Sequence, residues 1–349
     1  MKKLYRFIVV PLIVASALVG CKNDKDDEKK SSISQLPSQQ HIIFNEHNMM
    51  MHLRTFQDIA MNNGGNRAVG SAGGRESAKY IIEQTNRAGF RHTVTAFKNS
   101  RNQNGQNIIV EIPGKSNDTI ILIGAHYDSV QRSAGINDNA SGVSVLLELM
   151  DQLNQKKIQP NHTIRLAFWD AEETGLDGAK VYASKLKEAQ LKQIKAYINV
   201  DMVGTKDPIA MIPSVNKVAM LKELEQQIRE SARETGNAVD EGNLQQQLDE
   251  IRQMPTHPND LALNQSLGEF FKIEKLIVRE SRLINARTDI GAFIGKVPIT
   301  GFTFLSHTSG EELVRCYHKP CDTREMIEPK SLSISGKAVV FLLKNLKAL

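Results

Sequence analysis

Short apolar runs alternate with segments that carry apolar residues at helical spacing. Buried strands are predicted for the apolar runs at 107–114, 119–130, 163–170, 195–204 and 298–306. Helices are predicted on both sides of a glycine-rich break within 48–90, over 139–153, over 177–188 and from residue 331 to the last residue. This alternation predicts an α/β fold with a mixed sheet, parallel in its centre, and with helices on both faces.

The pattern changes between residues 214 and 282. Two long, polar helices are predicted there, within 217–236 and 243–254, and no strand is predicted. We expect a helical insertion on the side of the core. A lid, a dimer surface, a membrane-facing element and a solvated helical excursion are all compatible with this pattern.

The first residues have the pattern of a secretory signal. A basic start is followed by an apolar core at 7–19, which is too short for a comfortable membrane span and suits a signal peptide. The core ends in the sequence LVGC, and this resembles a bacterial lipoprotein signal. The resemblance implies that residues 1–20 are removed and that Cys21 carries the lipid. The alternative is an uncleaved anchor helix.

A charged segment rich in Ser and Gln follows and lacks apolar periodicity, so we expect a flexible tether over 21–40 and a catalytic domain over 41–349. The acidic residues near Cys21 resemble surface-export signals of some Bacteroidetes lipoproteins. The protein is therefore expected at the bacterial cell envelope, outside the cytoplasm and lipid-anchored to a membrane, with the outer membrane favoured.

Charge and cysteine content narrow the possible functions. The chain has 44 Lys and Arg against 39 Asp and Glu, and this mild excess gives no support for nucleic-acid binding, which needs clustered basic residues. Besides Cys21, only Cys316 and Cys321 are present. In an oxidising compartment a disulfide between them is favoured. Metal binding by the two thiols is the weaker alternative.

Ionisable residues gather where the predicted strands end. Two imidazoles and several carboxylates are carried by the segments after these strands and by a late loop; they are His126, Asp128, Asp138, Asp170, Glu172, Glu173, Asp201, His318 and Asp322. In α/β sheets, functional groups collect at the carboxyl ends of parallel strands. If these strands are neighbours, the side chains converge in one crevice.

Buried charges at this density are costly unless cations offset them. Imidazole nitrogen with carboxylate oxygen is a donor set that suits zinc. The number of donors is enough for two ions sharing one carboxylate. The adjacent glutamates Glu172 and Glu173 can then divide two roles, because one can bind metal while its neighbour acts as a general base.

The motifs GAHYDS, GINDNASG, FWDAEETGL, NVDMVG and YHKPCDT occur in this order. Together they resemble the co-catalytic di-zinc aminopeptidases, the family that includes the secreted bacterial leucine aminopeptidases and aminopeptidase S. The resemblance extends from Asn48 to the last residue and is poor over 214–282. It implies the phosphorylase/hydrolase-like fold of zinc exopeptidases. Thr288-Asp289-Ile290 departs from the more usual Ser-Asp-His of the family.

The resemblance also implies a ligand set. His126 and Asp201 are expected to hold one zinc, and Glu173 and His318 the other. Asp138 is expected to bridge the two zinc ions.

Further roles follow from the same resemblance. Glu172 matches the general base, and Asp128 matches a carboxylate that orients His126. The peptide bond between Asp138 and Asn139 corresponds to one that is often cis in the family.

The expected activity is hydrolysis of the N-terminal peptide bond of peptides with a free amine. A glutaminyl cyclase is the nearest alternative, but these enzymes usually bind one zinc and lack the loop around the bridging aspartate. A dipeptidase, carboxypeptidase or aminoacylase-like specificity is compatible with the same metal residues. A non-catalytic peptide-binding relative is disfavoured because all five ligands and the base are present.

Overall fold

The computed structural model describes residues 42–236, 238–306 and 315–349. The chain divides into two units, Met1–Ser38 and Gln39–Leu349, and the first lies entirely outside the described residues. The predicted signal peptide (1–20), the tether (21–40) and the lipidation site at Cys21 therefore lie outside the described residues. Of the helices in the described ranges, none combines the length and apolar character that a membrane span requires.

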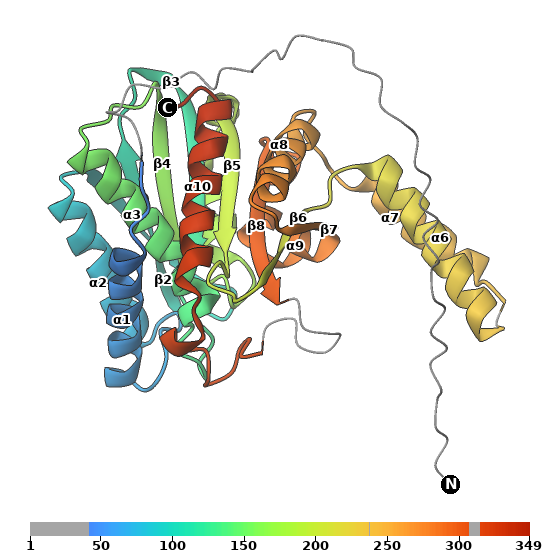
Figure 1. The fold of residues 1–349 in the computed structure, drawn as a ribbon, viewed down its shortest axis with the longest axis horizontal. Helices are drawn as coiled ribbons and strands as arrows, with labels where there is room; N and C mark the ends of the chain where they lie inside the picture. Colours follow the sequence, from blue (N-terminus) through green and yellow to red (C-terminus); the bar gives the residue numbers. More distant parts are fainter. Residues whose placement is uncertain (1–41, 237, 307–314) are drawn as a thin grey trace, which may run out of the picture. The chain divides into compact units, whose positions relative to one another are not determined.

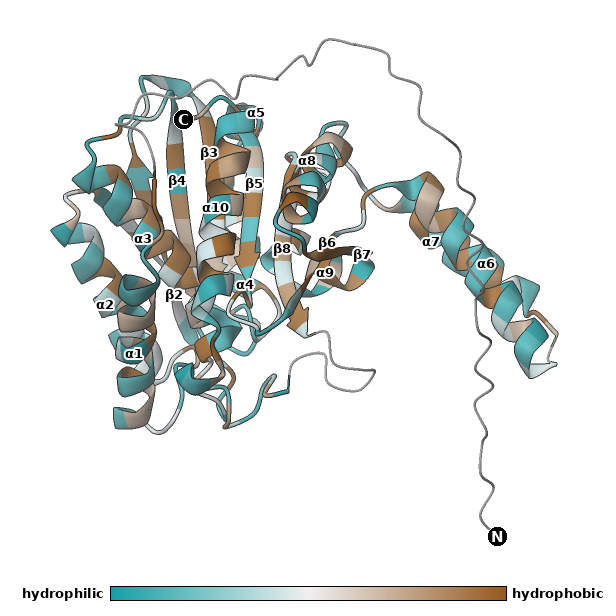
Figure 2. Cartoon of the chain, viewed as in Figure 1, coloured by the Kyte–Doolittle hydropathy of each residue, from teal (hydrophilic) through white to brown (hydrophobic). Residues whose placement is uncertain are grey.

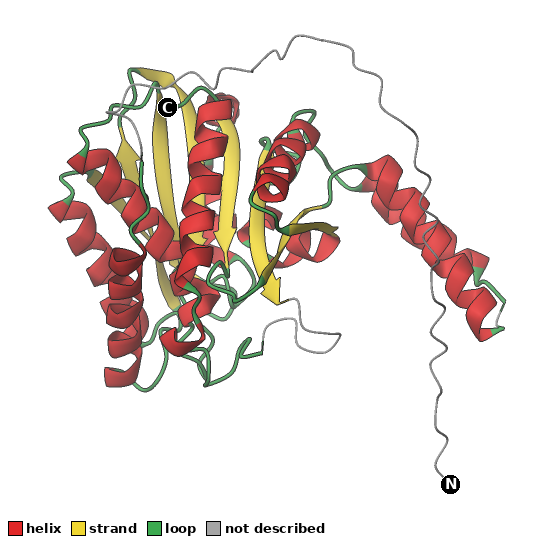
Figure 3. Ribbon diagram, in the orientation of Figure 1, coloured by secondary structure: helices red, strands yellow, loops and turns green. Residues whose placement is uncertain are grey.

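The second unit is built on one eight-stranded sheet, whose spatial order is β1-β2-β4-β3-β5-β8-β6-β7. Its strands are β1 (Arg91–Lys98), β2 (Asn104–Ile112), β3 (Ser116–His126), β4 (His162–Trp169), β5 (Ile194–Asp201), β6 (Pro208–Pro213), β7 (Ile277–Ser281) and β8 (Ile299–Ser306). The four central strands β4, β3, β5 and β8 run parallel, while β1, β2 and β6 each pair antiparallel with a neighbour (Figure 3). The predicted mixed sheet with a parallel centre is confirmed.

Helices cover both faces of the sheet (Figure 1). One face packs against α1 (Glu46–Asn62), α2 (Ala72–Arg87), α3 (Ser141–Gln155), α8 (Asp260–Ile273) and α10 (Pro329–Asn345). The other face packs against α4 (Asp177–Lys185), α5 (Glu188–Gln193) and α9 (Arg282–Arg287). Strand β3 serves both apolar layers because successive side chains point to opposite faces: Ile121 and Ile123 lie in the first, Leu122 in the second. Figure 2 shows the resulting apolar character of the central strands.

The prediction that 214–282 contains no strand is wrong. This segment includes β7, which pairs with β6, and α8, whose Leu267 and Phe271 are buried in the main core. Strand β7 was missed because it is a short edge strand with a mostly exposed, polar sequence. The two predicted polar helices are α6 (Lys217–Thr235) and α7 (Glu241–Gln253), and their buried residues, such as Leu224 and Leu248, form a separate apolar cluster.

The parallel centre decides where the functional side chains lie. Strands β3, β4 and β5 are neighbours, with His126 opposite Trp169 and Gly124 opposite Asn199 in the register. Their carboxyl ends therefore lie at one edge of the sheet, and the loops that leave them share one region.

Candidate metal centre

Two groups of metal-binding side chains occupy this edge of the sheet. His126, Asp138 and Asp201 form the first group, and Asp138, Glu173 and His318 form the second; within each group the candidate donor atoms lie within 4.8 Å of one another. His126 and Asp201 are the last residues of β3 and β5. Asp138 lies in the short, distorted helical segment η1 (Ile136–Ala140), and Glu173 and His318 come from loops. The structure thus brings together all five residues that the resemblance assigned to metal.

Asp138 joins the two groups through its two carboxylate oxygens. Its Oδ1 lies 3.2 Å from His126 Nε2, and its Oδ2 lies 3.2 Å from His318 Nε2. His318 Nε2 is also 3.0 Å from Glu173 Oε2, and His126 Nε2 is 3.5 Å from Asp201 Oδ1. One oxygen of Asp138 therefore faces each group, which is the arrangement a bridging carboxylate needs.

The donors fit divalent zinc. Oε1 of Glu173 and Oδ1 of Asp201 are buried and accept no hydrogen bond from any described residue, so two carboxylate oxygens are available to a cation. Leaving such oxygens unpaired costs free energy that a bound cation removes. Each group combines one imidazole nitrogen with two carboxylates, a donor set typical of catalytic zinc.

The pKa values of these groups reflect the same cost of burying several carboxylates together. Burial, followed by the neighbouring charge of Asp138, raises the pKa of Glu173 to about 7. Burial also raises the pKa of Asp201. For His318, burial acts to lower the pKa, but contacts with Asp138 and Glu173 outweigh it and raise the pKa to about 10. Without metal the carboxylates can be stabilised only by retaining protons in the cluster, and a cation would displace them.

Asp128 fixes the orientation of the first group. Its carboxylate lies 3.3 Å from His126 Nδ1, the ring nitrogen that faces away from the other ligands. The same carboxylate accepts hydrogen bonds from the backbone N–H groups of Glu172 (3.1 Å) and Glu173 (3.3 Å). Asp128 is fully buried, so one carboxylate sets both the imidazole and the turn that carries the two glutamates.

Glu172 lies beside the two groups without belonging to either. Its backbone is held by Asp128, and its side chain is partly buried. Burial raises its pKa well above the ordinary value, the positive charge of His126 opposes this, and the charges of Asp289, Glu173 and Asp201 add to it. The Glu172 carboxylate thus interacts electrostatically with the donors while it stays outside both ligand groups, as a general base requires.

Sequence reasoning gave no role to Arg67, which is fully buried beneath the site. Its guanidinium donates to the backbone carbonyls of Tyr127, Ala134 (2.8 Å) and Gly135 (2.5 Å). These bonds tie the segment after β3 to the loop that leads to Asp138. An arginine in a glycine-rich loop has no distinctive sequence signal, so its role depends on the long-range fold.

Asp322 and Asn139 position the bridging residue. Asp322 accepts hydrogen bonds from the backbone N–H groups of Asn137 (2.7 Å) and Asp138 (3.1 Å). The side chain of Asn139 accepts from Met202 N and donates to Val200 O, which links the Asp138 loop to the end of β5. The peptide bond between Asp138 and Asn139 is cis, as the resemblance implied. The sequence placed Asp322 near the site without indicating this contact.

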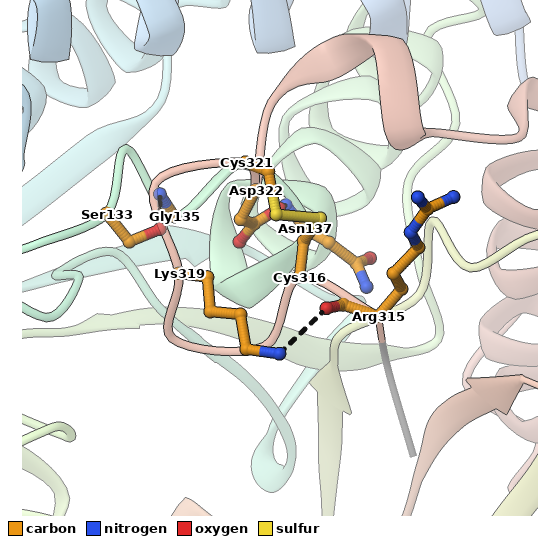
Figure 4. Close-up of a disulfide and its surroundings, with 8 residues drawn as sticks. All are labelled: Ser133, Gly135, Asn137, Arg315, Cys316, Lys319, Cys321 and Asp322. Atoms are coloured by element: carbon orange, nitrogen blue, oxygen red, sulfur yellow. Dashed lines mark hydrogen bonds between the residues drawn. A yellow bond between two sulfur atoms is a disulfide. The ribbon is translucent and has the colours of Figure 1, made fainter. Parts of the chain in front are cut away.

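A disulfide joins Cys316 and Cys321 (Figure 4), and His318 lies between them in the sequence. Lys319 Nζ donates to the carbonyl oxygen of Arg315 at 3.3 Å within the same loop. Because both sulfur atoms are in the disulfide, neither thiol is free to bind a metal. The closed loop holds His318 although no strand or helix carries it.

Three residues of the site have a strained backbone. Ala171, Met202 and His318 have φ values of 62°, 51° and 55°, in the left-handed region that residues other than glycine rarely adopt. Ala171 precedes Glu172, Met202 follows Asp201, and His318 is itself a predicted ligand. Such conformations cost roughly 1–3 kcal/mol each and occur mainly where function constrains the backbone.

Comparison with known proteins places the chain near one family of peptidases. Residues 107–253 match the model of Peptidase family M28. The leupeptin-inactivating enzyme 1 of Streptomyces exfoliatus is 30% identical over 305 residues, which are 86% of this chain and 62% of that relative. The comparisons support membership of peptidase family M28.

Two solved structures share the fold. A zinc aminopeptidase from Bacillus subtilis matches with a TM-score of 0.66 and 16% identity, covering 88% of this chain and 96% of the other. A glutaminyl cyclase from an Acidobacteriales bacterium matches with a TM-score of 0.65 and 20% identity, covering 90% and 99%. Since both enzyme classes use one fold, the fold alone does not choose between them.

Proposed function

We propose that this chain is an aminopeptidase of the M28 type that uses two zinc ions to hydrolyse the N-terminal peptide bond of peptides with a free amine. The observation that carries the proposal is the sharing of Asp138 between two ligand groups. A site built for one ion needs only one such group. The presence of both groups, rather than of either one alone, is what favours a hydrolase over a cyclase.

The proposed roles follow from these positions. His126 and Asp201 would hold one ion, Glu173 and His318 the other, and Asp138 would contact both. Zinc bound in such a pair polarises a carbonyl and lowers the pKa of water.

The remaining chemistry belongs to the chain. Glu172 would take a proton from the attacking water and deliver it to the leaving amine, which is general base and then general acid catalysis. Asp128 would keep the proton of His126 on Nδ1, so that Nε2 is free to bind metal. It would also hold the Glu172 backbone in place.

A substrate panel tests the proposal. Aminoacyl peptides with free amines are compared with the same peptides acetylated at the amine, before and after chelator treatment and after adding zinc back. We expect cleavage of the free-amine peptides only, loss of activity with chelator, and recovery with zinc. Equal cleavage of the acetylated peptides would contradict aminopeptidase activity.

The cyclase and the non-catalytic alternatives predict different outcomes of the same assay. A glutaminyl cyclase would release ammonia from peptides that begin with glutamine and would leave other free-amine peptides intact. A binding protein would show no chelator-sensitive turnover at all. The complete pair of ligand groups supports neither alternative as well as the hydrolase.

Lipid attachment at Cys21 and a location at the cell envelope stay predictions from the sequence. Their support is the basic start, the short apolar core and the following cysteine. Labelling of cells with a fatty-acid analogue should mark the wild-type chain and not the Cys21→Ser variant. Equal labelling of both would remove the prediction.

A further inference from the structure

A cavity of about 410 Å³ opens beside the second ligand group. Glu173, His318 and Asp128 form part of its wall, and Arg101 and Arg132 line it as well. We call this cavity the arginine pocket. It borders the group made of Glu173 and His318, and neither Glu172 nor Asp201 is among its lining residues. The pocket therefore lies on one side of the metal centre.

Arg101 reaches the pocket on an anchored turn between β1 and β2. The Asn99 side chain accepts from the backbone N–H groups of Arg101 (3.1 Å) and Gln103 (2.7 Å). The Asn99 amide also donates to Thr174 Oγ1 at 3.1 Å, and Thr174 directly follows Glu173. The turn is thus fastened to the segment that carries the glutamates, and this places Arg101 at the pocket.

Arg132 is held at the pocket wall by the loop that carries His318. Its Nε donates to the backbone carbonyl oxygen of His318 at 2.8 Å. Within the part of the chain that the structure describes, no carboxylate forms an ion pair with Arg132 or Arg101. Two guanidinium groups therefore add positive charge to this side, and their remaining donors are suited to a carboxylate.

Outside the arginine pocket the centre is acidic. Glu172 interacts electrostatically with Asp201 and Asp289 there, and both carboxylate oxygens of Asp289 are buried without a described hydrogen-bond partner. Negative charge on one side and positive charge on the other give the crevice a polarity. A peptide with a free amine matches it when its amine lies on the acidic side and a carboxylate of its leaving part lies on the arginine side.

We infer that the arginine pocket binds a carboxylate on the residue released from the substrate, so that the enzyme prefers peptides with an anionic group directly after the scissile bond. This inference rests on the proposed aminopeptidase function and specifies its substrate class. The carboxylate has two possible sources, the free C-terminus of a dipeptide or the side chain of an acidic second residue. The volume of the pocket admits either.

Four substrates separate these sources. Let X be the N-terminal residue that the panel above shows to be cleaved best. X-Gly is compared with X-Gly-amide for the terminal carboxylate, and X-Asp-amide is compared with X-Asn-amide for the side-chain carboxylate. We expect kcat/KM to be about tenfold higher for at least one anionic member, mainly through KM, and the preference to shrink at high salt.

Variants locate the effect. Arg101→Gln and Arg132→Gln should each reduce the anionic preference several-fold, whereas Arg132→Lys should keep part of it because the charge remains. The exposed Arg91 of β1, which does not line the pocket, provides the matched control. Arg91→Gln removes the same charge and should leave the preference unchanged.

Equal kcat/KM for all four substrates would overturn the inference and leave the aminopeptidase proposal intact. An anionic preference that persists in Arg101→Gln and Arg132→Gln alike would also overturn it, because the pocket would then not be its source. Failure to cleave any of the four, together with a failed panel, would remove the proposed function itself.

Discussion

The two ligand groups reach the same shared carboxylate by different structural routes. The first places His126 and Asp201 at the ends of neighbouring parallel strands, and the His126 side chain is only 2% exposed. The second takes Glu173 and His318 from loops, and the His318 side chain is 25% exposed. Strand geometry presets the first group, whereas hydrogen bonds and a disulfide must hold the second.

The difference teaches where each group is vulnerable. The first depends on the core of the sheet, which cannot shift without loss of packing. The second depends on a few local contacts. The Asp128 carboxylate accepts a hydrogen bond from the Glu173 backbone, and the Cys316–Cys321 disulfide closes the loop around His318. Variants can therefore affect both groups, the base beside them, or one group alone.

Removal of the shared carboxylate should have the largest effect. Asp138→Ala deprives both groups at once, so we expect the zinc content to fall well below one ion per chain and activity to drop by at least about a thousandfold. Elemental analysis and the peptidase assay measure this. Asp118→Ala, at an exposed position of β3, is the control. Retention of two ions by Asp138→Ala would refute the bridging role.

Glu172→Gln should separate chemistry from metal binding. The amide keeps the shape of the side chain but cannot accept the proton, and general base catalysis contributes about 10²–10⁴-fold. We expect turnover to fall by that factor with zinc content unchanged. Activity close to wild type would assign the base to another residue.

Asp128→Asn and Asp322→Asn should have intermediate effects. Neither residue belongs to a ligand group, but Asp128 orients His126, and Asp322 accepts from the backbone of Asp138. Loss of such supporting partners costs about 10–100-fold in metal affinity or activity. Zinc competition with a chromophoric chelator measures the affinity. Unchanged affinity in both variants would show that the ligands hold their positions without these carboxylates.

Opening the disulfide should have the smallest effect and should fall on one group. In Cys316→Ser the loop around His318 is no longer closed by the disulfide. We therefore expect the affinity for the more weakly held zinc to fall by at most about tenfold. The first group should keep its ion. Loss of both ions together would contradict the separate support of the two groups.

Much of this site could be predicted from the sequence because buried strands have a recognisable apolar pattern. The apolar runs that end in His126 and Asp201 place these residues at strand ends, and the adjacent Glu172 and Glu173 follow a third run. The parallel centre of the sheet then makes convergence a consequence of topology. The assignment of Glu173 and His318 to a second ion needed the resemblance, since loops carry no comparable period.

Other features could not be predicted for physical reasons. Arg67 acts through backbone carbonyls far away in the sequence, which no local pattern records. Strands β1 and β7 are exposed edges, so their apolar alternation is weak. The arginine pocket joins Arg101 and Arg132 from separate loops, and only the fold brings them together.

The central claim is that Asp138 links two zinc ions, and counting the ions tests it most directly. Zinc per chain is measured by elemental analysis on protein that has been stripped with chelator, reloaded and freed of excess metal, with peptidase activity followed in parallel. We predict two ions per chain and full activity only when both are present. A single tightly bound ion with full activity would contradict the account.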